Sequence, residues 1–313
     1  MKGLELSRAY FEEFGLPMLK EQFPELLPYL AAGRIGSGSE CLGFDDEIST
    51  DHDFEPGFLL FLPGEKLIDR RAAFRLERAY SKLPKEYRGY KRSLMAPVGG
   101  ARWGVVRTEE YLQEKLGRTD TNLSAFDWLS LPSQSLLELT DGSLFLDNLG
   151  TATRIREELS FYPPDIRLKK LAGHLLLAAQ AGQYNYARCL SHGEEAAAQL
   201  AVFEFVRHAA SAIFLLNEAY EPYYKWTFRA LRQLPKLSIE AELMEYLLTT
   251  DNGEKMREEK TNVIEGIAAD LIDELIVRKL SKAVCGDLEK HAYSVNDEIG
   301  DSGIRNLHIL AGV

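Results

Sequence analysis

The chain changes character near residue 150, and this change limits its fold more than any other feature. Up to that point, short apolar runs alternate with stretches of helical spacing, as in Phe58–Leu62 followed by Ile68–Leu83. Beyond it, the apolar pattern is long-range and helical and shows no strand signal. The pattern predicts an α+β fold with two domains: residues 1–150 with a small mixed sheet, and residues 151–313 as an all-α helical bundle.

The predicted bundle consists of long helices that end at Gly, Pro and Asn-Gly signals. Apolar residues recur in them at three- and four-residue spacing, which predicts one buried face, as at Leu200, Phe203, Val206 and Ala210. The predicted helices are Arg167–Leu190, Glu194–Tyr220, Tyr223–Leu234, Ile239–Thr249 and Glu254–Val284. Residues 286–313 fit two interpretations equally well, a docked tail or a partner-binding segment.

The first half is predicted to alternate helices with short strands. A helix is expected over residues 5–30 with a break near Gly15 and Pro17, and a tight hairpin is expected around Asp141-Gly142. The remaining predicted elements are a helix at Ile68–Leu83, a surface loop at Tyr87–Trp103, a strand at Gly104–Thr108, a helix through Leu116, a helical turn at Leu123–Leu131, and hairpin arms at Ser135–Thr140 and Ser143–Asp147.

Composition limits the partners and the compartment. The 37 basic and 48 acidic residues give a net charge of −11, which argues against a broad nucleic-acid surface and favours a small-molecule or protein partner. Three cysteines without metal-site spacing favour reduced thiols in a cytosol, and Cys41 is interpreted as a packing residue or, alternatively, a reactive one. No apolar run resembles a signal peptide or a membrane span, so we expect a cytoplasmic protein.

The chemistry is concentrated in two short motifs. Gly36-Ser37-Gly38-Ser39 has the small residues and hydroxyls that let backbone amides approach a phosphate. Asp51-His52-Asp53 follows at the start of an apolar stretch, and in a strand its two aspartates would project from the same face. Adjacent carboxylates repel each other unless a cation lies between them, and Mg²⁺ favours one or two carboxylates together with nucleotide phosphates.

Three other interpretations fit these motifs less well. A lone Asp-x-Asp is common in solvated loops and turn caps, but here it follows a Gly-Ser turn and precedes an apolar strand, so three signals agree in order. A dinucleotide fingerprint would need glycine at Cys41. An EF-hand loop would need a glycine that the acidic run Asp45–Glu55 lacks.

At these residues the chain resembles the nucleotidyltransferase superfamily of DNA polymerase beta and kanamycin nucleotidyltransferase. It is further similar to a bacterial family of uncharacterised proteins, a domain of unknown function, in which this domain is fused to a helical C-terminal half. The segments that carry the resemblance are Gly36–Ser39, Gly43–Asp45, Ser49–Asp53, Leu144–Asp147, Thr153–Arg156, Phe161–Pro163 and Tyr220–Trp226.

The resemblance implies a Mg²⁺- or Mn²⁺-dependent enzyme that transfers a nucleoside monophosphate from an NTP, such as ATP, to a hydroxyl or similar acceptor and releases pyrophosphate. Asp51 and Asp53 would be catalytic metal ligands, and a third carboxylate is expected on a neighbouring strand. Asp147 is the favoured candidate for that carboxylate, and Glu138 is the alternative. A non-catalytic nucleotide-binding or interaction protein, such as a partner in a toxin-antitoxin or signalling pair, remains the alternative function.

Five further residues are predicted to bind nucleotide. Gly36, Ser37 and Ser39 would hold the β- and γ-phosphates. In the helical half, Lys225 follows Tyr223-Tyr224, where a cation and aromatic rings could meet phosphate and base; aromatics packed between helices are the alternative explanation. Arg188 is a weaker phosphate-binding candidate, since such an arginine is often a surface ion-pair residue.

Overall fold

The computed structural model describes residues 1–48, 54–92 and 102–313, and these form two compact units. Unit 1 comprises residues 1–122 and 132–160. Unit 2 comprises residues 123–131 and 161–313. The predicted domain boundary at residue 150 stays a prediction.

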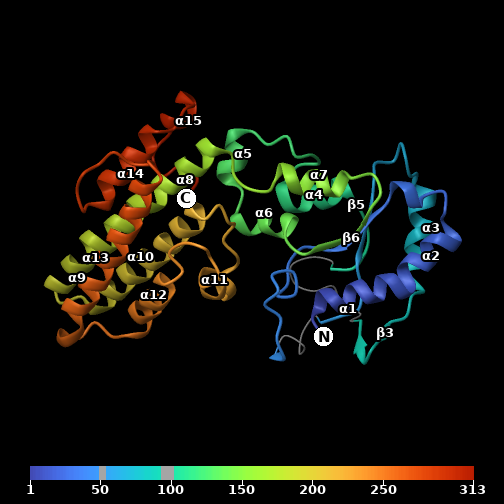
Figure 1. The fold of residues 1–313 in the computed structure, drawn as a ribbon, viewed down its shortest axis with the longest axis horizontal. Coiled ribbons are helices and arrows are strands. Elements are labelled where there is room, and N and C mark those ends of the chain that lie inside the picture. The colour runs from blue at the N-terminus through green and yellow to red at the C-terminus, as the bar shows by residue number, and fades with distance from the viewer. Residues whose placement is uncertain (49–53, 93–101) are drawn as a thin grey trace. The chain divides into compact units, whose positions relative to one another are not determined.

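Unit 1 is built on a four-stranded mixed sheet with the strand order β5-β2-β1-β6. Figure 1 labels two of its strands, β5 and β6. The central strand β1 (Ala31–Arg34) pairs antiparallel with both β2 (Leu59–Leu62) and β6 (Ser143–Asp147). Strand β5 (Gly104–Arg107) pairs with β2 in parallel. The prediction of a small mixed sheet in the N-terminal half is confirmed.

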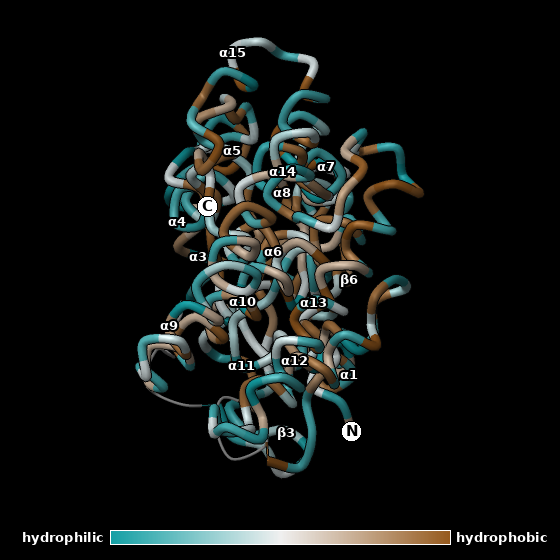
Figure 2. The backbone as a smooth tube through the Cα atoms, turned by 90° about the vertical axis from the view of Figure 1, so that its left-hand side faces the viewer, coloured by the Kyte–Doolittle hydropathy of each residue, from teal (hydrophilic) through white to brown (hydrophobic). Residues whose placement is uncertain are grey.

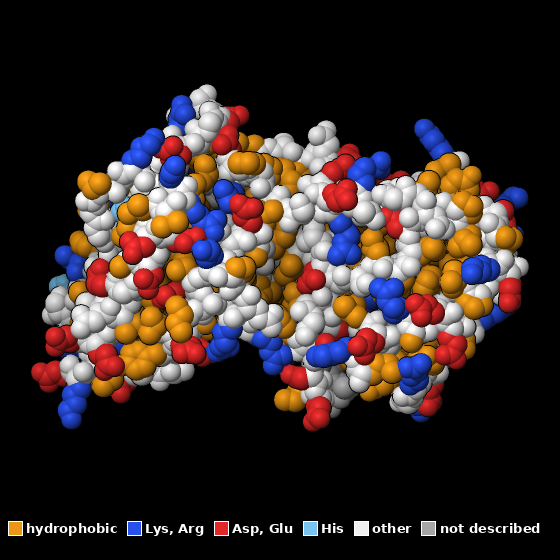
Figure 3. Space-filling view, in the orientation of Figure 1, with side chains coloured by type: hydrophobic (Ala, Val, Ile, Leu, Met, Phe, Trp, Pro, Cys, Tyr) orange, Lys and Arg blue, Asp and Glu red, His pale blue; other side chains and the backbone are white. Residues whose placement is uncertain are grey.

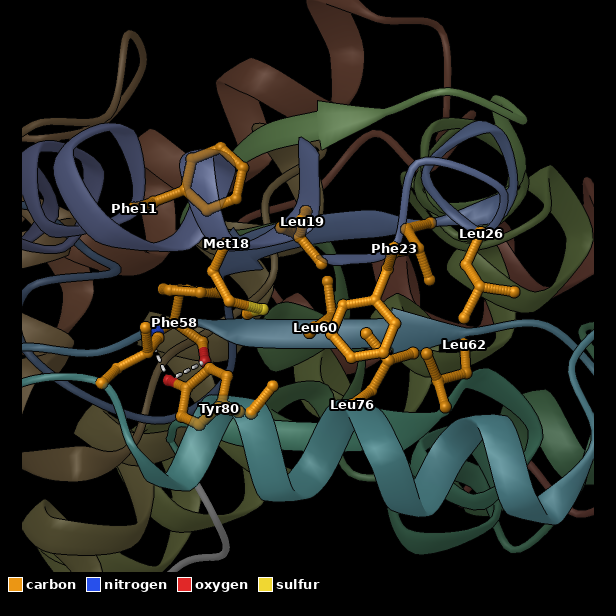
Figure 4. Close-up of a cluster of buried hydrophobic side chains, with 14 of the residues drawn as sticks. Phe11, Met18, Leu19, Phe23, Leu26, Phe58, Leu60, Leu62, Leu76 and Tyr80 are labelled. Atoms are coloured by element: carbon orange, nitrogen blue, oxygen red, sulfur yellow. Dashed lines mark hydrogen bonds between the residues drawn. The ribbon is translucent and has the colours of Figure 1, made fainter. Parts of the chain in front are cut away.

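One face of the sheet carries the main hydrophobic core of unit 1. Phe58, Leu60 and Leu62 alternate along β2 toward this core, as Figure 4 shows. The helix α3 (Arg70–Ser81) covers them from one side, and its Tyr80 hydroxyl donates a hydrogen bond of 2.7 Å to the carbonyl of Phe58. The prediction of a helix at 68–83 is therefore confirmed.

The N-terminal helical segment packs on the same core. It consists of α1 (Gly3–Tyr10), a π-helical turn (Phe11–Gly15) and α2 (Leu16–Gln22), and a short 3-10 turn (Leu27–Tyr29) leads into β1. The predicted break near Gly15 is wrong. A Cβ at Gly15 would lie 2.5 Å from the ring of Phe58, so the glycine permits close helix–strand packing. Pro17 lies in the first turn of α2, where its missing N–H costs little.

The opposite face of the sheet is covered by α4 (Thr108–Leu116), α6 (Ser133–Thr140) and α7 (Thr151–Glu158). Phe61 of β2 points to this side, and its ring centroid lies 5.3 Å from that of Tyr111. The predicted hairpin arm at 135–140 is wrong, because this segment is α6. Its buried residues, Leu136 and Leu139, are three apart and therefore share one helical face.

Two smaller elements complete unit 1. The strands β3 (Glu86–Tyr87) and β4 (Tyr90–Lys91) form a short antiparallel hairpin within the region predicted as a surface loop. The predicted strand at 104–108 and the following helix through Leu116 are confirmed as β5 and α4.

Unit 2 is helical throughout its described secondary structure, as predicted (Figure 1). Hydrophobic and hydrophilic residues alternate along its helices (Figure 2). The elements are α5 (Ala125–Ser130), α8 (Pro164–Ala178), a π-helical segment (Ala179–Tyr186), α9 (Ala187–Ser191), α10 (Glu195–Leu216), α11 (Tyr224–Leu231), α12 (Glu240–Thr249), α13 (Glu254–Val277), α14 (Leu288–Asp297) and α15 (Ser302–Arg305).

Helix α10 is the most apolar helix of unit 2. Its composition and length would allow it to cross a membrane, contrary to the prediction that no apolar run is long enough, but 67% of its most apolar window is buried inside the protein. The predicted buried face is only partly correct. Val206 and Ala210 are buried, whereas Leu200 and Phe203 are 69% and 52% exposed.

The C-terminal segment is docked on α8. Two buried lysines of this helix hold it: Lys169 Nζ donates to the carbonyl of Leu307 at 2.7 Å, and Lys170 Nζ donates to the carbonyl of Gly312 at 2.8 Å. Burial lowers the pKa of Lys170 to about 8. The structure therefore supports the interpretation of residues 286–313 as a docked tail.

Candidate functional site

A glycine-rich turn follows directly after β1 in unit 1. Gly36 has a φ of +107° and Gly38 a φ of +136°, backbone conformations that L side chains rarely adopt. A Cβ at Gly36 would lie 2.9 Å from the Tyr111 hydroxyl. The predicted Gly36–Ser39 segment is thus a tight turn at the end of a buried strand, a position from which backbone amides can reach a ligand.

The turn is flanked by a buried ion pair. Arg34 and Glu40 are 2% and 5% exposed, and Arg34 Nη2 lies 2.6 Å from Glu40 Oε1. Arg34 Nη1 also donates to the carbonyl of Arg102 at 2.6 Å. Neither Arg34 nor Glu40 was singled out from the sequence, although they immediately flank Ile35–Ser39; the only signal was their opposite charge.

The cysteine beside the turn is a packing residue. Cys41 is 4% exposed, and its Sγ lies 3.9 Å from the carbonyl oxygen of Arg34. Burial is the main reason that the pKa of Cys41 rises to about 12, and the Glu40 carboxylate raises it further. A thiol with this pKa stays protonated near neutral pH, so the structure supports the packing interpretation over the reactive one.

Asp51 and Asp53 lie outside the described residues, so their predicted role as catalytic metal ligands stays a prediction. Within the described ranges 1–48, 54–92 and 102–313, no group of three or more His, Cys, Asp and Glu side chains could hold a metal ion. The described residues alone therefore do not supply the predicted metal site.

Asp147 ends β6 and precedes α7, as expected, but the strand register places it away from the turn. Asp147 pairs with Ala31, at the start of β1, whereas the turn follows Arg34 at its end. Three residues of strand span about 10 Å. One carboxylate oxygen of Asp147 accepts a hydrogen bond of 2.7 Å from the amide of Thr153.

Around Asp147, the structure forms a small cavity of about 220 Å³. Its wall includes the apolar side chains of Phe61, Leu112 and Ile155 and the carboxylates of Asp147 and Glu109. Asp147 Oδ1 and Glu109 Oε2 are buried and lack a hydrogen-bond partner among the described residues. The predicted role of Asp147 as metal ligand stays a prediction, and the register does not bring it to the Gly36 turn.

Glu138, the alternative third acid, lies on α6 instead of on a strand. One of its oxygens lies 2.8 Å from Lys115 Nζ, and the other accepts a hydrogen bond of 2.7 Å from the side-chain amide of Gln134. The pairing with Glu138 favours the protonated ammonium of Lys115 and opposes the effect of burial on the pKa of that lysine. Glu138 is thus already neutralised by a partner in unit 1.

A different acid lies at the turn's end of the sheet. The register pairs Arg34 with Ser143, and a Cβ at Gly142 would lie 2.2 Å from the carbonyl oxygen of Arg34. Asp141 immediately precedes Gly142 in the chain. Its Oδ1 accepts a hydrogen bond of 2.8 Å from the amide of Gly142.

Asp141 is partly buried, and its surroundings shift its pKa. Burial raises the pKa of Asp141, and the Gly142 amide and the Arg156 guanidinium oppose this rise. The Asp141 charge in turn contributes to the raised pKa of Cys41. The sequence alone does not point to Asp141, because Asp141-Gly142 also suits a tight hairpin turn.

Arg156 lies beside Asp141. Its Nη2 donates to the carbonyl of Thr140 and, at 3.4 Å, to the carbonyl of Gly142. Burial lowers the pKa of Arg156, and the charge of Asp141 opposes that change. Arg156 therefore ties α7 to the segment that precedes β6.

Lys225 and Arg188 belong to unit 2. Lys225 Nζ lies 5.1 Å from the centroid of the Trp226 ring, and the Arg188 guanidinium lies 5.2 Å from that of Tyr184. Both cations thus contact aromatic faces within their own unit. Their predicted nucleotide-binding roles stay predictions.

Comparisons with known proteins give two matches. Residues 128–227 match the family described as domain of unknown function (DUF4037), and this range contains Asp141, Asp147 and Lys225 but not the Gly36 turn. The match confirms the predicted resemblance to a domain family of unknown function. No curated protein matches the chain.

Among solved structures, the chain is similar to the crystal structure of a nucleotidyltransferase-like protein from Exiguobacterium sibiricum 255-15. The alignment covers 90% of this chain and 89% of that chain, with 12% sequence identity and a TM-score of 0.38.

Proposed function

We propose that the chain is a nucleotidyltransferase that acts on a nucleoside triphosphate. An acceptor hydroxyl attacks the α-phosphorus, the new phosphorus–oxygen bond forms, and the bond to the leaving pyrophosphate breaks. The observation that carries the proposal is the Gly36–Ser39 turn at the end of β1, with two glycines at positive φ. It precedes Asp51 and Asp53 in the order of the superfamily that the sequence resembles.

In this proposal the turn binds the phosphates. Successive amides in a turn with positive φ form a concave site for anions, and the hydroxyls of Ser37 and Ser39 add further donors. Small residues at Gly36 and Gly38 let the phosphate oxygens approach the backbone closely. These contacts would hold the β- and γ-phosphates and fix the α-phosphorus relative to the acceptor.

Asp51 and Asp53 would hold Mg²⁺ or Mn²⁺, which neutralises charge on the phosphates when bound. A third carboxylate at the Gly36 end of the sheet suits this proposal, and we assign the role of third acid to Asp141. The register and the close approach of Gly142 to Arg34 support this assignment over Asp147. Asp141 is also suited to take the proton of the acceptor hydroxyl, because burial raises its pKa toward that of a useful base.

We further propose a small-molecule or protein acceptor and a cytoplasmic location. The net charge of −11 supports an acceptor other than a long nucleic acid. On the face shown in Figure 3, basic and acidic side chains are interspersed, which is typical of an ordinary solvated surface.

The proposal is tested by two assays on the full chain. Calorimetry with ATP, GTP, CTP and UTP measures binding with and without Mg²⁺, and a pyrophosphate-release assay with candidate acceptors measures turnover. We expect Mg²⁺-dependent binding of at least one NTP, and we expect Asp51→Ala and Asp53→Ala to abolish turnover. Asp297→Ala, which removes an exposed carboxylate on α14, is the matched control and should keep full activity.

Turnover that persists in Asp51→Ala or Asp53→Ala would contradict the assignment of these two aspartates as catalytic metal ligands. Mg²⁺-dependent binding without pyrophosphate release from any acceptor would favour the non-catalytic alternative, a nucleotide-binding interaction protein.

A further inference from the structure

Arg34 lies just before the glycine-rich segment, and an arginine at such a place can bind phosphate. Its surroundings argue otherwise. Arg34 is 2% exposed, and its guanidinium is engaged at three nitrogens. Nε and Nη2 lie 3.1 and 2.6 Å from Glu40 Oε1, and Nη1 lies 2.6 Å from the carbonyl oxygen of Arg102.

Glu40 connects this guanidinium to the turn. A Cβ placed on Gly38 would lie 2.4 Å from Glu40 Oε2, so the carboxylate occupies the space beneath the glycine backbone. Glu40 is also reached by a second guanidinium, since Arg102 Nη1 lies 3.9 Å from its Oε1. Two cations thus share one carboxylate directly beside the turn.

The backbone bonds of the turn strengthen the same arrangement. The amide of Cys41 donates to the carbonyl of Gly38 at 3.2 Å, and the amide of Phe44 donates to the carbonyl of Ser39 at 2.8 Å. Carbonyls of the turn are therefore bonded within the segment. The ion pair between Arg34 and Glu40 connects the two residues that flank the segment 35–39.

A buried ion pair is seldom retained for stability, because the desolvation of two charges offsets most of their attraction. Its better-supported use is to select one conformation among several. Gly36 and Gly38 allow the turn many backbone conformations. An ion pair that favours one of these conformations would therefore order the turn.

We propose that Arg34 and Glu40 are positioning residues that hold the Gly36–Ser39 turn in its phosphate-binding shape, and that Arg34 is not itself a phosphate ligand. The inference rests on the proposed function for the identity of the ligand. The claim that the pair orders the turn stands apart from any ligand and is tested separately.

The test uses a double variant, Arg34→Met with Glu40→Leu, in the full chain. Removing both charges leaves neither Arg34 nor Glu40 as an unpaired buried ion, and Arg102 loses only its longer contact of 3.9 Å with Glu40. The melting temperature should therefore stay close to that of the wild type. Hydrogen exchange read by mass spectrometry should become about tenfold faster in residues 36–40 and stay unchanged elsewhere. Binding of Mg²⁺·NTP should weaken by about tenfold, because an unordered turn must be ordered on binding.

The matched control is Arg278→Met with Glu274→Leu, which removes a pair at the C-terminal end of α13 whose Nε–Oε1 distance is 2.6 Å. It should change neither the exchange of residues 36–40 nor NTP affinity. If the double variant at 34 and 40 does not fold, Arg34→Lys is measured instead. Lysine keeps the charge but lacks the planar fork, so exchange at 36–40 should still rise.

The outcomes are separable. Unchanged exchange at residues 36–40 in the folded variant overturns the positioning role, whatever the ligand. Wild-type NTP affinity in a variant whose turn exchanges faster also overturns it. Absence of NTP binding by the wild-type chain overturns the proposed function, and the exchange measurement then decides the ordering of the turn alone.

Discussion

The two ends of the sheet in unit 1 differ in what they offer a ligand. At one end, β1 runs into a glycine-rich turn beside the buried pair of Arg34 and Glu40, and Asp141 lies next to it. At the other end, Asp147 lines a small cavity whose wall combines apolar side chains with a second carboxylate, Glu109. Both ends carry an acid from the same short segment of chain. The difference shows that strand register decides which acid can serve the turn.

The largest expected effect separates the two acids. Asp141→Asn should lower the rate of pyrophosphate release by about 10²-fold, because it removes the proposed base and metal ligand. Asp147→Asn, the matched substitution at the other end, should change the rate by less than about threefold, since it touches no proposed reacting group. The measurement is kcat at saturating NTP.

Equal losses in both variants would break the comparison between the two ends. A large loss in Asp147→Asn alone would restore the assignment made from sequence.

A second prediction concerns the turn itself. Gly38→Ala should lower the free energy of unfolding by about 2–3 kcal/mol, because it combines strain at positive φ with a clash against Glu40. Gly43→Ala is the control: its φ is +71°, and no neighbouring atom lies within 4 Å of the added Cβ. We expect about 1 kcal/mol there. Urea denaturation gives both values.

If the two alanine variants lose the same stability, the close approach of Glu40 to the turn is unimportant.

The smallest expected effect concerns pH. Burial raises the pKa of Asp141 in the folded chain above its ordinary value of 3.8. The folded state then holds the proton more tightly than the unfolded state, so this group favours folding at low pH, and the contribution is lost as pH rises from 3.8 through the folded pKa. Relative to Asp141→Asn, the wild-type chain should therefore become less stable over that window.

The measurement is the free energy of unfolding from urea titrations between about pH 3.5 and pH 7, because ordinary and raised carboxyl pKa values fall in this range. A parallel pH dependence in wild type and Asp141→Asn would show that Asp141 is not buried as described.

The sequence predicts the parts of unit 1 that depend on local pattern. The apolar run of β2, the helix α3 and the Gly36 turn depend on neighbouring residues, and the structure contains all three. The arm at 135–140 was predicted incorrectly because Leu136 and Leu139 suit a helical face, and the Asp141-Gly142 pair also suits a helix end.

The site could be predicted only in part because it depends on long-range register. The pairing of Arg34 with Ser143 joins residues far apart in the chain, and no local signal specifies it. The Arg34–Glu40 pair was missed for a related reason, since its burial is a property of the folded unit. In unit 2, Leu200 and Phe203 follow a helical period yet are exposed, because α10 buries neighbouring positions instead.

The central claim is that triphosphate binds at the Gly36 end of the sheet. The most direct test is a crystal structure of the chain with a non-hydrolysable NTP and Mn²⁺, whose anomalous signal locates the metal. We expect phosphate oxygens within hydrogen-bonding distance of the amides of Gly36–Ser39 and a metal peak close to the Asp141 carboxylate. Phosphates and metal beside Asp147, at the opposite end of β6, would contradict the account.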